Sequence, residues 1–134
     1  MPAISELSEV LHNQAEPIAK RMRCLFYLRT IGTPEVIPVL ASAFNDPSLL
    51  LQHEICYVLG QINHKSAISF LTSVLANEAA ASISRHEAAE AIAAIGDTES
   101  LELLNRYSQD PDAILSDTCK LAVSRIDWLK SGEE

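Results

Sequence analysis

Apolar residues recur every three to four positions in eight stretches of the chain, and short polar turns separate these stretches. Such spacing places the apolar side chains on one face of an α-helix. In one of the longer stretches the apolar positions i, i+3, i+4 and i+7 are Ile55, Val58, Leu59 and Ile62. No β-strand is needed to account for the pattern. The sequence therefore predicts an all-α protein in which each helix buries one stripe against a neighbour.

The stretches also form a repeat. Four long ones align on an apolar helix that ends in Ile and a small or turn residue, and their starts lie 31, 33 and 31 residues apart. A shorter helical pattern precedes each of them, and helix pairs at such a period stack into an α-solenoid. Because the W…LG…Y and A…F…P landmarks of tetratricopeptide repeats are missing, the pairs resemble HEAT repeats. We expect one domain over residues 1–134 with four helical hairpins, at about 4–32, 34–63, 65–96 and 98–129.

Turn residues divide the chain at the same places. Asp-Pro dipeptides at 46–47 and 110–111 precede two of the long stretches, and we expect Asp to cap the helix and Pro to occupy its first turn. Gly32, Asn63 and Gly96 directly follow three of the long stretches. These residue types tolerate the left-handed conformation that ends many helices. We therefore expect them to be C-caps.

Charge and composition exclude two classes of partner. The chain has 10 Lys and Arg against 18 Asp and Glu, a net charge of −8, and only 5% aromatic residues. An acidic surface without a basic, aromatic groove does not favour nucleic acid. No apolar run approaches the ~20 residues that span a membrane, and the first residues lack a basic, apolar leader. We expect no nucleic acid and no membrane as partners, and we expect residues 130–134 to form a solvated tail or the stub of a connector.

The three cysteines, Cys24, Cys56 and Cys119, are an odd number without a CxxC pair, and each lies inside an apolar helical stretch. Buried free thiols are typical of a reducing compartment. The sequence therefore favours a cytoplasmic location.

The two central repeats carry the same dipeptide, His-Glu, at the same position of their long helices: His53-Glu54 and His86-Glu87. The outer repeats have Met-Arg and Asp-Thr there. Neighbouring helices of this kind lie ~10 Å apart, within reach of an imidazole from one side and a carboxylate from the other. Two imidazoles and one or two carboxylates form a ligand set for a divalent metal, and the two-histidine, one-carboxylate set suits non-haem Fe(II). We predict that these four side chains converge on a metal.

Other polar residues leave alternatives open. Glu90 lies one turn beyond the second His-Glu pair, where it could bind a cationic group or pair with a Lys or Arg on the solvated face. Gln52 and Arg85 directly precede the two histidines and are either donors to the carboxylates or exposed side chains. His12 and His64 have no counterpart in the other repeats, and we assign them no role. The chain contains no HExxH, CxxC, GxSxG, GxxxxGK[ST] or GxGxxG motif.

Several segments around the His-Glu pairs resemble the amino-terminal half of the deoxyhypusine hydroxylases. The resemblance covers nearly the whole chain and is carried by RMRCLFYLRTIG at 21–32, AFND at 43–46, LLQHEICYVLGQI at 50–62, RHEAAEAIAAIGD at 85–97 and DTCKLAVSRIDWL at 117–129. It implies a HEAT-repeat di-iron monooxygenase, with Fe(II) and Fe(III) as the cofactor. The activity that it implies is the hydroxylation of deoxyhypusine on a translation initiation factor to give hypusine.

The resemblance also implies roles for particular residues. The iron ligands would be His53, Glu54, His86 and Glu87. Glu90 would receive the substrate amine, and Ile83 would stand where the family often has a methionine that lines the substrate channel.

The family has four His-Glu motifs, two in each half, whereas this chain has two. The resemblance therefore implies a partner that supplies the others, either the carboxyl-terminal half of the enzyme or a second copy of the chain. Two other functions stay open from the residues alone. One is a HEAT scaffold that binds a protein or helps attach a pigment, as the phycobilin lyases do. The other is a mononuclear metal hydrolase.

Overall fold

A computed structural model describes residues 3–132, which fold into paired helices. The first helices of the pairs are α1 (Ile4–His12), α3 (Val36–Ala43), α5 (Ile68–Ala76) and α7 (Leu101–Tyr107). The second helices are longer: α2 (Ile18–Ile31), α4 (Leu49–Ile62), α6 (Ser82–Ile95) and α8 (Ala113–Gly132). Short 3-10 turns, η1 (Lys65–Ala67) and η2 (Thr98–Ser100), lead into α5 and α7. No strand occurs in this part of the chain.

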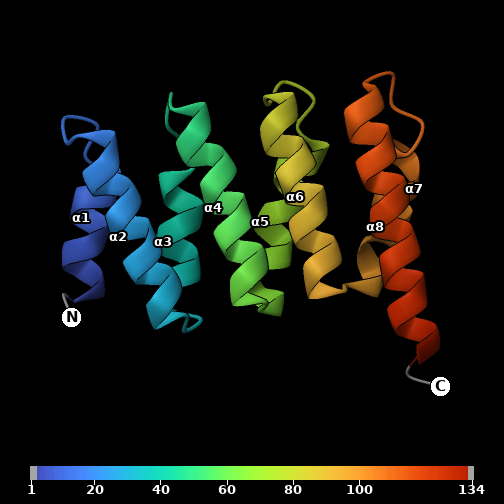
Figure 1. Cartoon of the computed structure of the whole chain (residues 1–134), viewed down its shortest axis with the longest axis horizontal. Helices are drawn as coiled ribbons and strands as arrows, with labels where there is room; N and C mark the ends of the chain where they lie inside the picture. The colour runs from blue at the N-terminus through green and yellow to red at the C-terminus, as the bar shows by residue number, and fades with distance from the viewer. Residues whose placement is uncertain (1–2, 133–134) are drawn as a thin grey trace.

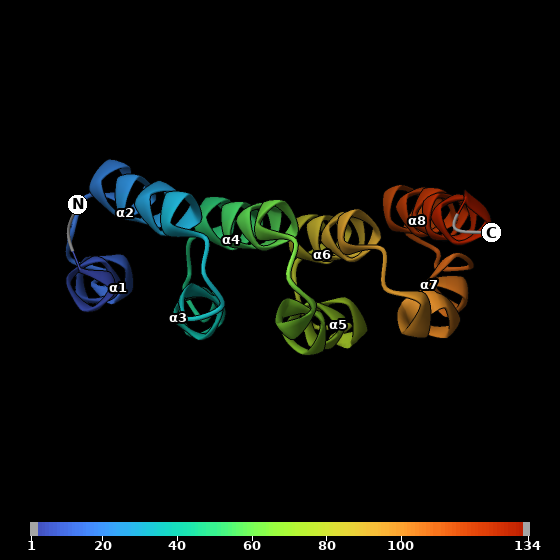
Figure 2. The same ribbon diagram turned by 90° about the horizontal axis from the view of Figure 1, so that it is seen from below.

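The helices form two layers (Figures 1 and 2). The helices α2, α4, α6 and α8 stand in one row and α1, α3, α5 and α7 in the other, and the two termini lie at opposite ends of the stack. The core fills the space between the layers and is almost entirely aliphatic. Its largest fully buried side chains are Leu11, Leu25, Leu28, Leu40, Leu51, Ile55, Leu59, Leu71, Leu75, Ile92, Leu104 and Leu115. The predicted all-α solenoid of helical hairpins is confirmed.

The long helices α4 and α6 pack closely against each other at a small-residue contact. A Cβ atom on Gly60 would lie 3.0 Å from both Cα and Cβ of Ala91, closer than ordinary packing allows. Around this point α6 buries a run of alanines, Ala88, Ala89, Ala91 and Ala93. Small side chains let the axes of two helices approach each other. Side chains at equivalent positions of α4 and α6 can therefore reach one another.

The predicted C-caps are confirmed. Gly32, Asn63 and Gly96 have φ values of 61°, 58° and 80° and end α2, α4 and α6. Each also donates its N–H to the carbonyl four residues earlier. Asn63 is the one non-glycine residue with positive φ among residues 3–132. Asparagine adopts this left-handed conformation more readily than most other residues.

The prediction that Asp caps the long helices was wrong at both Asp-Pro dipeptides. The helix α4 is capped by Ser48, whose Oγ accepts from the N–H of Leu51 at 3.2 Å. Asp46 Oδ1 instead accepts from the N–H of Ser48 at 2.9 Å, a tight turn that holds the carboxylate two residues before the cap. Before α8, Asp112 Oδ1 accepts from the N–H of Leu115 at 3.2 Å, and Asp110 takes the earlier turn position.

The last turn of α8 corrects a second expectation. Residues 130–132 continue this helix to Gly132 instead of forming a tail, and residues 133–134 lie outside the described residues. None of the helices in the described part has the length and apolar content that a membrane span requires. All three cysteines are free and buried, as predicted.

Candidate metal centre

The two His-Glu pairs meet where α4 and α6 lie side by side. Glu87 occupies the centre: its Oε1 is 2.9 Å from Nε2 of His53 and 3.9 Å from Nε2 of His86. The Glu87 side chain is 10% exposed, and those of His53 and His86 are 27% and 25% exposed. The repeat alone accounts for this convergence, because equal positions in adjacent repeats fall on equal positions of adjacent helices. Both Nε2 atoms therefore face one carboxylate in a half-buried site.

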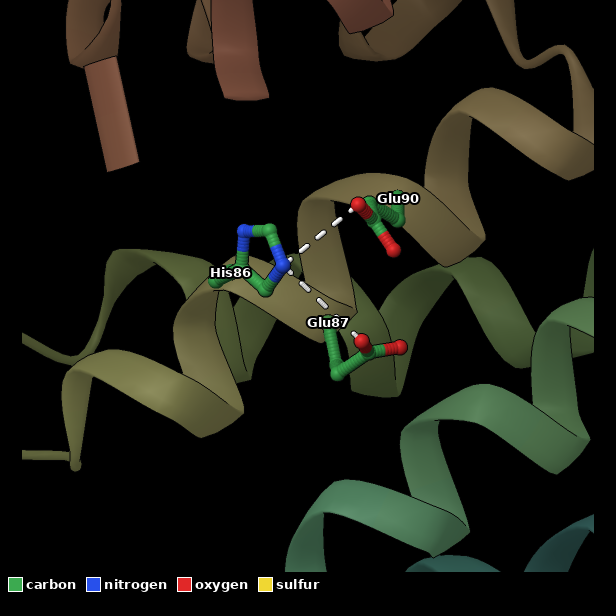
Figure 3. Close-up of side chains that lie close together, drawn as sticks. All are labelled: His86, Glu87 and Glu90. Atoms are coloured by element: carbon green, nitrogen blue, oxygen red, sulfur yellow. Dashed lines mark ion pairs between the residues drawn. The ribbon is translucent and has the colours of Figure 1, made fainter. Parts of the chain in front are cut away.

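Glu90 joins the same group of atoms (Figure 3). Its Oε1 is 3.4 Å from Nε2 of His86. One ligand atom from each of His86, Glu87 and Glu90 lies within 4.8 Å of the others, a spacing that could hold a metal ion. The Glu90 side chain is 53% exposed, so it reaches the cluster from the solvent side. No lysine or arginine within residues 3–132 forms an ion pair with it.

Glu54 lies on the other edge of the His53 ring. Its Oε1 is 3.1 Å from Nδ1 of His53, whereas Glu87 faces Nε2 of the same ring. An ionised carboxylate only accepts hydrogen bonds, so the ring nitrogen of His53 that carries the proton donates to the carboxylate it faces, Glu54 at Nδ1 or Glu87 at Nε2. The structure thus brings Glu54 to the cluster through His53 and leaves Nε2 to face Glu87.

His86 has a different partner on its second nitrogen. Nδ1 of His86 lies 2.6 Å from Oγ1 of Thr118, which belongs to α8 in the next repeat. Thr118 was not among the residues predicted to belong to the site. The signal that could have found it is its register, because Thr118 stands in the fourth repeat where Glu54 and Glu87 stand in the central ones.

Burial sets the electrostatics of the centre. It raises the pKa of Glu87 above the ordinary carboxyl value, and the charge on Glu90 adds to the rise, while His53 and His86 oppose it. Burial, with a smaller contribution from the charge on Glu87, also raises the pKa of the Cys56 thiol to about 12. A thiol with this pKa stays protonated at neutral pH and is a poor metal ligand.

The donor set fits a divalent cation. Two Nε2 atoms and the carboxylates of Glu87 and Glu90 converge, and no positively charged side chain of the described residues pairs with either carboxylate. When the Nδ1 atoms carry the ring protons, each Nε2 presents a lone pair to a carboxylate. A bound metal ion would offset the repulsion between these lone pairs and the carboxylate charges. A ligand set of imidazole and carboxylate suits Fe(II).

The residues next to the histidines do not contact the carboxylates. Arg85 is buried, its Nε donates to the carbonyl of Leu75 at 2.9 Å, and its guanidinium lies 4.9 Å from the centroid of the Tyr107 ring. Gln52 donates to the carbonyl of Asp46 at 2.8 Å. The expectation that Arg85 is either a donor to the carboxylates or an exposed side chain was therefore wrong, because its side chain turns to Leu75 of α5 and Tyr107 of α7.

Ile83 and the two unassigned histidines lie apart from this group of atoms. Ile83 stands one turn before His86 on α6, and 46% of it is exposed. Nε2 of His12 lies 2.8 Å from Oγ of Ser42, and Nδ1 of His64 accepts from the N–H of Ser66 at 3.1 Å. His12 thus contacts α3 of the next helix pair, and His64 makes a local contact before η1.

Two clefts meet at Glu90. One, of about 210 Å³, lies between α4 and α6, and the other, of about 190 Å³, lies between α6 and α8. Most of their lining is apolar: Tyr57, Gly60, Ala91 and Ala94 in the first, and Ala93, Ala94, Leu121 and Ala122 in the second. An alkyl chain fits such walls, and a carboxylate between them suits a cationic group on that chain.

Comparisons with known proteins agree on the fold. A family model described as HEAT repeats matches residues 4–84, and one described as PBS lyase HEAT-like repeat matches residues 84–110. The chain is 42% identical to the deoxyhypusine hydroxylase of Gallus gallus over 132 residues, which are 98% of this chain and 44% of the relative. It is also 42% identical to the Homo sapiens enzyme over 127 residues, 95% of this chain and 42% of that enzyme.

A solved structure of human deoxyhypusine hydroxylase in complex with glycerol is similar in three dimensions. It matches with a TM-score of 0.94 at 42% identity and covers 97% of this chain and 45% of the human chain. The chain therefore spans less than half the length of the relatives that it matches.

Proposed function

The chain belongs to the HEAT repeat family and is a half-length homologue of the deoxyhypusine hydroxylases, and from this we propose that it is the amino-terminal, metal-binding half of such an enzyme. The reaction would be the iron- and oxygen-dependent hydroxylation of deoxyhypusine on a translation initiation factor. The three buried free thiols favour the reducing cytoplasm as its location.

The observation that carries the proposal is the position of Glu87 between the Nε2 atoms of His53 and His86, at 2.9 and 3.9 Å. We assign these three side chains as iron ligands. Iron with open coordination positions supplies the activation of oxygen. Glu54, predicted from the sequence as a fourth ligand, contacts Nδ1 of His53 and holds that ring in place.

Glu90 and the two clefts give the substrate a place to bind. Deoxyhypusine is a long alkyl side chain with amino groups, and the clefts are apolar with Glu90 between them. Glu90 forms no ion pair with a lysine or arginine of the described residues, and a carboxylate of this kind attracts a protonated amine. Ile83, exposed one turn before His86, would contact the alkyl part from the amino-terminal end of α6.

The ligand count implies a partner. One chain supplies two imidazoles and three carboxylates near each other, enough for one iron with open positions but too few for two. We propose that the carboxyl-terminal half of the enzyme supplies the second iron site. A second copy of this chain is the alternative source, and the two differ in whether the chain alone is active.

A second candidate function is a HEAT scaffold without metal chemistry, which the match of residues 84–110 to the PBS lyase HEAT-like repeat favours. This match covers one repeat, whereas the identity to the deoxyhypusine hydroxylases extends over 98% of the chain. A scaffold does not need the His53–Glu87–His86 arrangement, so partner binding would survive a change of His53 to Ala.

The test is reconstitution. The chain is loaded with Fe(II) without oxygen, mixed with the part of the human enzyme that this chain does not match, and given oxygen and a protein that carries deoxyhypusine. We expect the substrate to gain the mass of one oxygen atom, and we expect no gain with His53→Ala, which serves as the matched control.

The possible results separate the proposals. Hydroxylation by the chain alone, with a dimer in sedimentation, would identify the second copy as the partner. Iron binding without hydroxylation in any mixture would contradict the proposed reaction. A chain that retains no iron would contradict the metal site itself.

A further inference from the structure

Thr118 has one hydroxyl proton and two partners. Its Oγ1 donates to the carbonyl of Ile114 at 2.7 Å, one turn earlier on α8. The same oxygen lies 2.6 Å from Nδ1 of His86 on α6. A hydroxyl donates one hydrogen bond and accepts through its lone pairs. Because the proton goes to Ile114, Thr118 accepts from His86, and the proton of a neutral His86 ring is on Nδ1.

This assignment decides what Nε2 of His86 can do. With the proton on Nδ1, the lone pair on Nε2 points toward Glu87 and Glu90, whose oxygens are 3.9 and 3.4 Å away. With the proton on Nε2, the ring would instead donate to one of these carboxylates and could not bind a cation there. The form with the proton on Nδ1 can therefore bind a metal ion through Nε2, and the form with the proton on Nε2 cannot. The hydrogen bond on Nδ1 selects between the two forms.

We infer that Thr118 is a positioning residue, which accepts the Nδ1 proton of His86 and so keeps Nε2 free for a metal ion. The inference deepens the proposed function and rests on the same site. Thr118 is 7% exposed and lines the cleft between α6 and α8. It also lies in a repeat without a His-Glu pair, which gives the fourth repeat a part in the centre.

The test begins with the metal-free chain, so that it does not depend on activity. Long-range nitrogen–proton correlation spectra at about pH 9, where imidazole rings carry a single proton, identify which ring nitrogen holds it. We expect Nδ1–H at His86 in the wild type. In Thr118→Val, which keeps the side-chain shape and removes the hydroxyl, we expect Nε2–H. Thr118→Ser should restore Nδ1–H.

Metal affinity is the second measurement. Titration of the same proteins with Co(II), a spectroscopic substitute for Fe(II), should show affinity about 10-fold weaker in Thr118→Val and near the wild-type value in Thr118→Ser. The matched control is Thr72→Val. Thr72 also donates to the carbonyl four residues earlier, Ile68, at 2.9 Å, but lies on α5 in the other layer. The Thr72→Val variant should leave the position of the His86 ring proton and the Co(II) affinity unchanged.

Nδ1–H at His86 in the Thr118→Val chain, or equal loss of affinity in the valine and serine variants, would overturn the inference. Failure of the proposed function looks different. A wild-type chain that shows Nδ1–H, loses it in Thr118→Val and binds no metal would contradict the metal site while supporting the role of Thr118.

Discussion

His53 and His86 occupy the same position in adjacent repeats, yet their Nδ1 atoms have partners of different kinds. Nδ1 of His53 contacts Glu54 of its own helix at 3.1 Å, whereas Nδ1 of His86 contacts Thr118 of the next repeat at 2.6 Å. A carboxylate increases the basicity of the ring more than a neutral hydroxyl does. The first histidine is therefore oriented by a local, charged contact, and the second depends on how the fourth repeat packs against the third.

This difference shows how a repeat protein can use one dipeptide for two tasks. Glu54 and Glu87 follow their histidines in the same way, but Glu54 faces Nδ1 of its own histidine and Glu87 faces Nε2 of both. Because the stack has a direction, each repeat meets a different neighbour on its two sides. The same residue type thus contacts the ring of its own repeat in one case and faces the rings of both repeats in the other.

The largest effect should come from removing either ring. We expect His53→Ala and His86→Ala each to abolish Co(II) binding by the isolated chain, because both Nε2 atoms face Glu87 and one imidazole leaves the ligand set incomplete. His64→Ala is the matched control, since His64 makes a local contact with Ser66. Isothermal titration calorimetry measures the binding. Full Co(II) affinity in either His53→Ala or His86→Ala would contradict the assignment of that histidine as a ligand.

A change away from the His-Glu pairs should affect folding and not the metal. Asp46 pairs with Arg21 at 2.6 Å, and both are buried. Removing one partner of a buried pair leaves an uncompensated charge, so Asp46→Ala should lower the free energy of unfolding by about 3 kcal/mol. Asp110→Ala is the control, because Asp110 holds the equivalent turn before α8 and accepts from the N–H of Asp112. Its loss should be smaller.

The Asp46 effect should depend on pH. Burial alone would raise the pKa of Asp46, but the hydrogen bonds from Arg21 and the Ser48 N–H and the charge on Arg21 lower it overall. A depressed carboxyl pKa contributes stability above the ordinary value of 3.8 that is lost as the pH falls through the folded-state pKa. The difference between wild type and Asp46→Ala in urea unfolding should therefore be full at about pH 7 and shrink well below pH 3.8. A difference that grows in acid would contradict the pair.

The smallest effect should come from Glu54. We expect Glu54→Gln to weaken Co(II) binding about 10-fold, because the amide can still accept from Nδ1 of His53 but no longer carries charge. Glu87→Gln should weaken it far more, since Glu87 itself faces both Nε2 atoms. If the two variants lost equal affinity, Glu54 would be a ligand like Glu87, and the distinction between the two glutamates would be wrong.

Most of the fold and the convergence of the four His-Glu side chains could be predicted because both follow from the repeat. Residues at equal positions of adjacent repeats lie at equal positions of neighbouring helices. His53 and Glu87 were therefore expected to lie close to each other. The left-handed caps at Gly32, Asn63 and Gly96 were predictable because few residue types accept that conformation.

The details that depend on side-chain reach could not be predicted in this way. Asp46 lies in a tight turn and pairs with Arg21, an interaction that competes with the helix cap and leaves that role to Ser48. Arg85 is buried under Tyr107, although its neighbours in sequence line the centre. Thr118 contacts His86 across two repeats, and nothing in the order of residues says which rotamer brings them together.

The most direct test of the metal centre is X-ray absorption at the iron edge of the chain loaded with Fe(II) without oxygen. The arrangement of His53, His86 and Glu87 predicts one iron per chain with scattering from two imidazole rings, and the loss of that iron in His86→Ala. Iron bound without imidazole scattering, or retained equally by His86→Ala, would contradict a centre built on these two histidines.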